Sequence, residues 1–152
     1  MRLTSRLAFC IIWLIALPAF AKTTVIDDSG TLPYNAAFAM RWQEFAPRGA
    51  AGNLMVGSLQ LRVRLTVAPF LRHTGRIYLV LPAQQPGGMS ASWTTQGRLL
   101  PGQVNSGGRT LVYAGPITTP FIEDTVQLTI TVDGRRMLQT YPVNFRFEID
   151  ED

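Results

Sequence analysis

The chain has 152 residues, a formal net charge of +4, one histidine and one cysteine, and 47% of its residues are hydrophobic. This length and composition fit one ordinary domain with a single core. The small charge excess, with no basic run and no nucleic-acid motif, argues against nucleic acid as a partner. One cysteine and one histidine cannot supply the ligands of a zinc site.

Residues 1–21 have the three parts of a secretory signal peptide. Arg2 and Arg6 supply the positive start, and an apolar run covers residues 7–17. Ala-Phe-Ala at residues 19–21 has the small-x-small pattern of a cleavage site. The apolar run is shorter than the roughly 20 residues that a membrane span needs, so we expect cleavage, with a retained anchor as the alternative.

Cleavage would leave one domain, residues 22–152, in the periplasm or outside the cell, with no transmembrane segment. It would remove Cys10, so the mature chain would have no disulfide. Cys10 lies inside the apolar run behind bulky Phe9, which argues against lipid modification. Loss of Arg2 and Arg6 lowers the net charge from +4 by two, to +2.

The first mature segments have weak patterns. We expect residues 22–32 to be flexible. Residues 34–42 are ambiguous: alternating apolar side chains over 38–42 favour a strand, whereas Asn-Ala-Ala at 35–37 is typical of the start of a short helix. We interpret the segment as a strand.

Residues 57–67 give the clearest strand pattern, because aliphatic and polar residues alternate from Leu59 onward. Successive side chains on a strand point to opposite faces, so one set is predicted to be buried. At roughly 1.5 to 3 kcal/mol each, five such side chains contribute on the order of ten kcal/mol before ordering entropy is subtracted. The residues predicted to face the core are Leu59, Leu61, Val63, Leu65 and Val67.

Three shorter strands are predicted in the middle of the chain, over residues 76–81, 89–94 and 109–114. Each is bounded by segments rich in glycine and proline, which are typical of turns. The stretch 97–108 contains four glycines and one proline. We expect that stretch to be flexible.

Alternation returns near the C-terminus, over residues 126–132 and again over 143–149. Asp133-Gly134 between them favours a hairpin followed by a final strand. Pro142 has no N–H to donate, which fits the start or the edge of a strand. We therefore expect the last strand at the margin of its sheet.

Many short strands, frequent turns and the lack of a repeat or long amphipathic helix predict an all-β fold. We expect an antiparallel β-sandwich, Ig-like in shape, with roughly seven or eight strands. In size, signal peptide and alternating C-terminal strand the chain resembles fimbrial subunits, and this resemblance implies a surface appendage. Many fimbrial subunits have a disulfide, which is absent here, and no specific motif carries the resemblance.

We predict that the mature chain is not an enzyme and needs no cofactor or metal ion. His73, the only histidine, lies in a predicted turn, and there is no Gly-x-Ser-x-Gly motif. Adjacent carboxylates occur at Asp27-Asp28 and Glu123-Asp124, and we interpret both pairs as surface turns. A small carboxylate-dependent hydrolase is the least favoured alternative.

One stretch of the chain has the composition of a binding surface. Tryptophan, amide and arginine side chains on glycine-rich loops suit sugars or the backbone of another protein. In the competing interpretation Trp93 alternates with Met89 and Ala91 and therefore faces the core, and the remaining residues form an ordinary loop. The candidate ligand or partner residues are Trp93, Gln96, Arg98, Gln103, Asn105 and Arg109.

Export, few catalytic groups and strand edges able to pair with a partner favour a non-catalytic bacterial envelope protein that acts through protein–protein interaction. A fimbrial-like subunit, an adhesin-like module for cell adhesion and an assembly accessory all fit. The expected partners are other envelope proteins, including a chaperone or appendage subunits. The alternative is a periplasmic module that binds a carbohydrate or small apolar ligand through residues 93–109.

Overall fold

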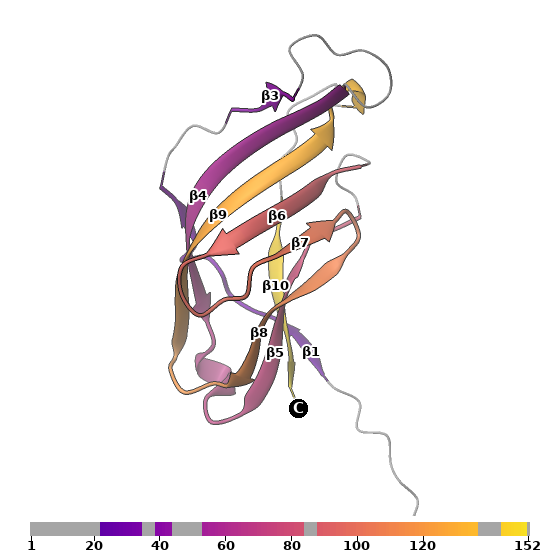
Figure 1. Cartoon of the computed structure of the whole chain (residues 1–152). Helices are drawn as coiled ribbons and strands as arrows, with labels where there is room; N and C mark the ends of the chain where they lie inside the picture. The colour runs from indigo at the N-terminus through magenta and orange to yellow at the C-terminus, as the bar shows by residue number, and fades with distance from the viewer. Residues whose placement is uncertain (1–21, 35–38, 44–52, 84–87, 137–143, 152) are drawn as a thin grey trace, which may run out of the picture.

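The fold is all-β: in this computed structural model two antiparallel sheets pack together as a β-sandwich (Figure 1). The predicted antiparallel β-sandwich is therefore confirmed. The predicted signal peptide, residues 1–21, lies outside the part of the chain that the structure describes. The described residues are 22–34, 39–43, 53–83, 88–136 and 144–151.

The larger sheet has six strands in the order β2-β4-β9-β6-β7, with β3 also paired to β4. Its centre is an antiparallel ladder between β4 and β9, each thirteen residues long. The ladder keeps one register from Leu54–Asp133 to Thr66–Phe121. The strands are β2 (Leu32–Pro33), β3 (Arg41–Trp42), β4 (Leu54–Thr66), β6 (Ser90–Thr95), β7 (Gly102–Asn105) and β9 (Phe121–Asp133).

The smaller sheet has four antiparallel strands in the order β1-β10-β5-β8. The chain after β1 passes from the smaller sheet to the larger one. The Ile26 N–H donates to the carbonyl of Phe147 in the smaller sheet over 2.8 Å, and the next residue, Asp27, pairs with Thr66 of the larger sheet. The strands are β1 (Thr23–Val25), β5 (Thr74–Val80), β8 (Arg109–Pro116) and β10 (Arg146–Glu151).

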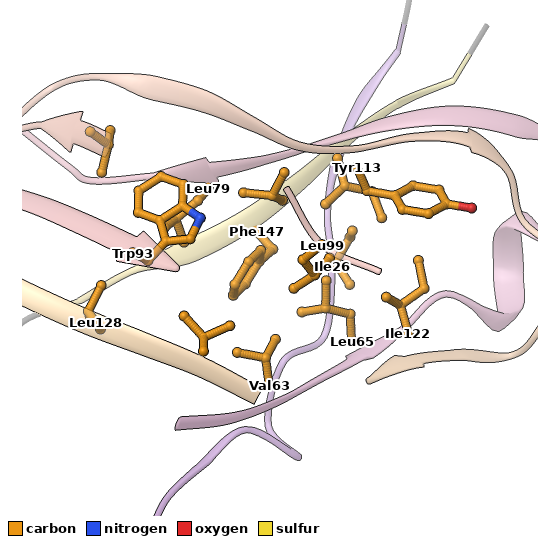
Figure 2. Close-up of a cluster of buried hydrophobic side chains, with 14 of the residues drawn as sticks. Ile26, Val63, Leu65, Leu79, Trp93, Leu99, Tyr113, Ile122, Leu128 and Phe147 are labelled. Carbon is orange, nitrogen blue, oxygen red and sulfur yellow. The ribbon is translucent and has the colours of Figure 1, made fainter. Parts of the chain in front are cut away.

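Apolar side chains from both sheets form one buried cluster between them. Figure 2 shows Trp93, Leu128 and Val63 of the larger sheet lying close to Phe147 of the smaller sheet. The alternation predicted from Leu59 is confirmed, although its first two members are only half-buried where they pack against the cluster.

The predicted middle strands at 76–81, 89–94 and 109–114 correspond to β5, β6 and β8. The structure has more strands than expected because β1, β2 and β7, with two to four residues each, were not predicted. One of them, β7, lies within the stretch 97–108 that we expected to be flexible. In the ambiguous segment 34–42 only β3 is described as a strand, and residues 35–38 lie outside the described part.

The expected position of the last strand is wrong. β10 lies inside the smaller sheet between β1 and β5, while β9 belongs to the larger sheet, so no hairpin joins β9 to β10. After β9 the Asp133 carboxylate accepts the Arg135 N–H at 3.1 Å, and residues 134–136 form a 3₁₀ turn. Pro142 lies outside the described residues. Among the described residues no helix has the length and hydropathy to cross a membrane.

Candidate functional site

Trp93, the first candidate binding residue, is part of the core. It is 5% exposed, and its indole N–H donates to the Leu100 carbonyl over 2.9 Å (Figure 2). The inward interpretation drawn from its alternation with Met89 and Ala91 is confirmed. Its ring contributes to the interior of the sandwich and not to an exposed binding surface.

Three other candidates lie on the larger sheet or at its end. Gln103 and Asn105 are exposed on β7, in register with Ser92 and Ser90 of β6. Gln96 is exposed just after β6, where it lines a polar hollow of about 470 Å³ that also contains Tyr34, Arg62 and Glu123.

The remaining two candidates lie in separate places. The guanidinium of Arg98 donates to the Tyr113 hydroxyl at 3.3 Å and lies 5.7 Å from the centre of that ring. Arg109 begins β8 in the smaller sheet and lies 3.7 Å from the centre of the Tyr78 ring. The six candidates therefore do not form one contiguous surface.

Arg109 is the centre of an ion-pair network on the smaller sheet. Its Nη2 lies 2.6 Å from Asp150 Oδ1, and its Nε lies 3.6 Å from Glu148 Oε2. The Thr23 hydroxyl also donates to Asp150 Oδ1 over 2.6 Å. These hydrogen bonds from Arg109 and Thr23 hold the pKa of Asp150 below its usual range. The network links β8 to β10 and β10 to β1.

The interpretation of Glu123-Asp124 as a surface turn is wrong, because both residues lie within β9. Asp124 is 7% exposed and accepts two backbone N–H groups, from Leu99 at 2.8 Å and from Gln96 at 3.2 Å. The chain after β6 is thus folded around a buried carboxylate. Glu123 points to the opposite face, where it lies 3.4 Å from Arg64.

The free edge of β1 is the first place where the geometry allows binding. Hydrogen-bonded pairs alternate along an antiparallel ladder, and Ile26 and Thr24 belong to the bonded pairs with β10. The N–H and C=O groups of Thr23 and Val25 therefore point away from β10, and the described part of the chain offers them no backbone partner. The Val25 side chain beside them is 62% exposed.

A hollow of about 420 Å³ runs along this edge. Pro69 and Phe70, from the 3₁₀ turn Ala68–Phe70, give it an apolar wall opposite Thr24 and Ile26. The Thr24 hydroxyl is buried and has no hydrogen-bond partner within the described residues. The edge thus combines outward backbone groups with a recess large enough for a side chain.

The other sheet margins are better protected. On β8 the Val112 carbonyl accepts the Leu100 N–H at 2.7 Å, and on β7 the Gln103 carbonyl accepts the Thr110 hydroxyl at 2.6 Å. β2 and β3, which flank β4, are only two residues long each. Contacts from the rest of the chain cover the margins at β7 and β8, whereas the described part of the chain offers the outward backbone groups of β1 no backbone partner.

A cavity between the two sheets is the second place where the geometry allows binding. Its volume is about 280 Å³, and apolar side chains make up most of its lining. Protein interiors rarely contain voids larger than a water molecule. The half-exposed lining residues Asp28, Thr31 and Leu61 show that this cavity opens to the surface.

No match is found when the chain is compared with protein-family models, with curated proteins and with solved structures. Within the described ranges, no group of three or more His, Cys, Asp or Glu residues is placed to hold a metal ion.

Proposed function

We propose that the chain is a non-catalytic protein of a bacterial envelope, exported through a cleaved signal peptide, and that it acts by accepting a β-strand of a partner protein at β1. The observation that carries this proposal is the outward backbone edge of Thr23 and Val25 beside an apolar hollow. Main-chain hydrogen bonds give affinity in strand addition, and recesses for alternate side chains give specificity.

A partner strand beside β1 would pair with the N–H and C=O groups of Thr23 and Val25. Every second side chain of that strand would point toward the interior, where Phe70 and Pro69 offer an apolar contact. Lys22 and Glu151 also line the hollow, and they would favour a partner strand with charges of opposite sign facing them. The smaller sheet would then gain a fifth strand.

The carboxylates support a non-catalytic role, because they already make structural contacts. Asp124 holds the backbone after β6, and Asp150 and Glu148 pair with Arg109. The finer proposals are an Ig-like form of the sandwich and a role as a fimbrial-like subunit, adhesin-like module or assembly accessory. The proposed partners are other envelope proteins, including a chaperone or appendage subunits, in the periplasm or at the cell surface.

Site-specific photo-cross-linking in cells tests the proposal, with the photoreactive residue at position 22. Val25→Pro removes an outward N–H and leaves the bonds of Thr24 and Ile26 to β10 in place, so we expect a discrete adduct to fall at least about tenfold. Val25→Ala keeps the N–H and should keep the adduct. Both variants should melt within about 2 °C of the wild type.

Thr24→Pro is the control for loss of an inward N–H. It removes an N–H that faces β10, so it should lower the melting temperature. An adduct that survives Val25→Pro at full strength would refute strand addition at this edge, as would the absence of any discrete adduct in the wild type.

A further inference from the structure

The cavity between the sheets has an apolar interior and a polar opening. Buried side chains from both sheets line its interior, among them Trp93, Leu99, Leu128 and Phe147. The half-exposed lining residues mark the opening, and these are Asp28, Thr31, Leu61 and Phe145. We propose that this cavity binds one small amphipathic molecule, with its aliphatic body inside and a hydrogen-bond-donating head, an amine or a hydroxyl, at Asp28.

The size of the cavity sets the size of the ligand body. An apolar cavity of about 150 Å³ is large enough for benzene, so about 280 Å³ accommodates an aliphatic body of about eight to ten carbon atoms. The walls from Val112, Val126 and Leu128 carry no polar atom on their side chains, which disfavours a sugar inside. The interior therefore selects a hydrocarbon body.

The opening selects the head group. The Thr31 N–H donates to the Asp28 carbonyl at 2.8 Å, which places both residues in one tight turn. The Thr31 hydroxyl oxygen accepts the Arg64 N–H at 3.1 Å, so this oxygen already has a hydrogen-bond partner. The Asp28 carboxylate is a strong acceptor for an ammonium or hydroxyl donor, and it repels an anionic head.

The two proposed sites are independent, because no residue lines both the cavity and the hollow beside β1. A failure of ligand binding would therefore leave strand addition standing, and the reverse also holds.

Calorimetric titration and thermal melting of purified residues 22–152 test the inference with n-octylamine, 1-octanol and octanoate. We expect octylamine and octanol to bind saturably and to raise the melting temperature with concentration. Octanoate should bind at least about tenfold more weakly than octylamine. Asp28→Asn should weaken octylamine, leave octanol nearly unchanged and remove the discrimination against octanoate.

Val126→Phe fills the cavity from β9 and should reduce octylamine affinity at least about tenfold. Val126→Leu adds only one methylene and serves as a milder second filling variant if the larger side chain prevents folding. Leu100→Phe is the control, because Leu100 is exposed and does not line the cavity. No saturable binding of octylamine or octanol to the wild type, or unchanged octylamine affinity in a folded filling variant, would overturn the proposal.

Discussion

The two sheets of the sandwich are stabilised in different ways. In the larger sheet the thirteen-residue strands β4 and β9 share a continuous ladder, whose outer face carries a row of short polar side chains as well as the ion pair of Arg64 with Glu123. Ser58 and Thr129 lie in one cross-strand row with Ser92 and Gln103, and the hydroxyls of the first two are 3.0 Å apart. In the smaller sheet no strand exceeds eight residues, and its outer face carries the network around Arg109.

The difference indicates which strand separates most easily from its neighbours. Cutting any single pair of the long ladder leaves most of the larger sheet intact. The three residues of β1, in contrast, depend on a few backbone bonds and on the contact of Thr23 with Asp150. A marginal strand with few contacts opens locally more easily than the strands at the centre.

The largest effect is expected from Leu65→Ala, which empties a completely buried position of β4 in the core that both sheets share. We expect a loss of about 2 to 5 kcal/mol in the free energy of unfolding, measured by urea denaturation. Arg64→Ala, at an exposed neighbour, should change it by less than about 1 kcal/mol. A loss below about 1 kcal/mol for Leu65→Ala would mean that the sheets do not share one core.

Asp124→Ala should give the next largest effect, because it leaves the Leu99 N–H without its acceptor, whereas the Gln96 N–H keeps the Thr125 carbonyl at 3.1 Å. We expect a loss of about 1 to 3 kcal/mol in the free energy of unfolding. Glu123→Ala is the matched control on the exposed face, with an expected change within about 0.5 kcal/mol. Equal losses for the two neighbours would contradict the structural role of the buried carboxylate.

Asp150→Asn should loosen β1 without unfolding the larger sheet. It weakens the contacts of Arg109 and Thr23, so the amides of Thr24 and Ile26 should exchange faster with solvent. We expect a change of up to about 1 kcal/mol in global stability. Unchanged exchange in β1, or equally increased exchange in β4 and β9, would show that the network does not hold β1.

Acid should have a similar, smaller effect on the same strand. The pKa of Asp150 is lowered in the folded protein, so its stabilising contribution is present above the unfolded value of about 3.9 and is lost as the pH falls further. The protection of the β1 amides, measured relative to intrinsic exchange at the same pH, should fall below about pH 4 in the wild type. The Asp150→Asn variant should lack this part of the acid response.

Thr24→Val should have the smallest effect, and with the opposite sign. The buried hydroxyl has no partner among the described residues, so replacing it with a methyl group of similar size should stabilise the protein by up to about 1 kcal/mol. A clear loss in the urea midpoint would indicate that this hydroxyl has a partner.

The sequence predicted the elements whose signal is local. Alternation from Leu59 to Val67 belongs to one segment, so the strand and its buried face could be inferred without knowledge of its neighbours. The burial of Asp124 could also have been predicted from the sequence. Asp124 lies two residues from both Ile122 and Val126, so on a strand its side chain points to the same inner face of β9.

Features that depend on distant partners left no local pattern. β1 exists because Thr23 meets Asp150, 127 positions later, and Arg109 meets the same carboxylate across 41 positions. β7 is four residues long and glycine-led, so its composition indicated a loop. The β1 edge and the cavity both arise from such long-range packing, and of the candidate residues chosen by composition only Trp93 lines either of them.

Amide hydrogen exchange at Val25, in the free protein and in the complex recovered by cross-linking at position 22, tests strand addition most directly. In the free protein we predict rapid exchange at Thr23 and Val25, beside protected amides at Thr24 and Ile26. Partner binding should slow exchange at Val25 at least about tenfold. A bound partner that leaves the Val25 amide as exposed as before would contradict the account.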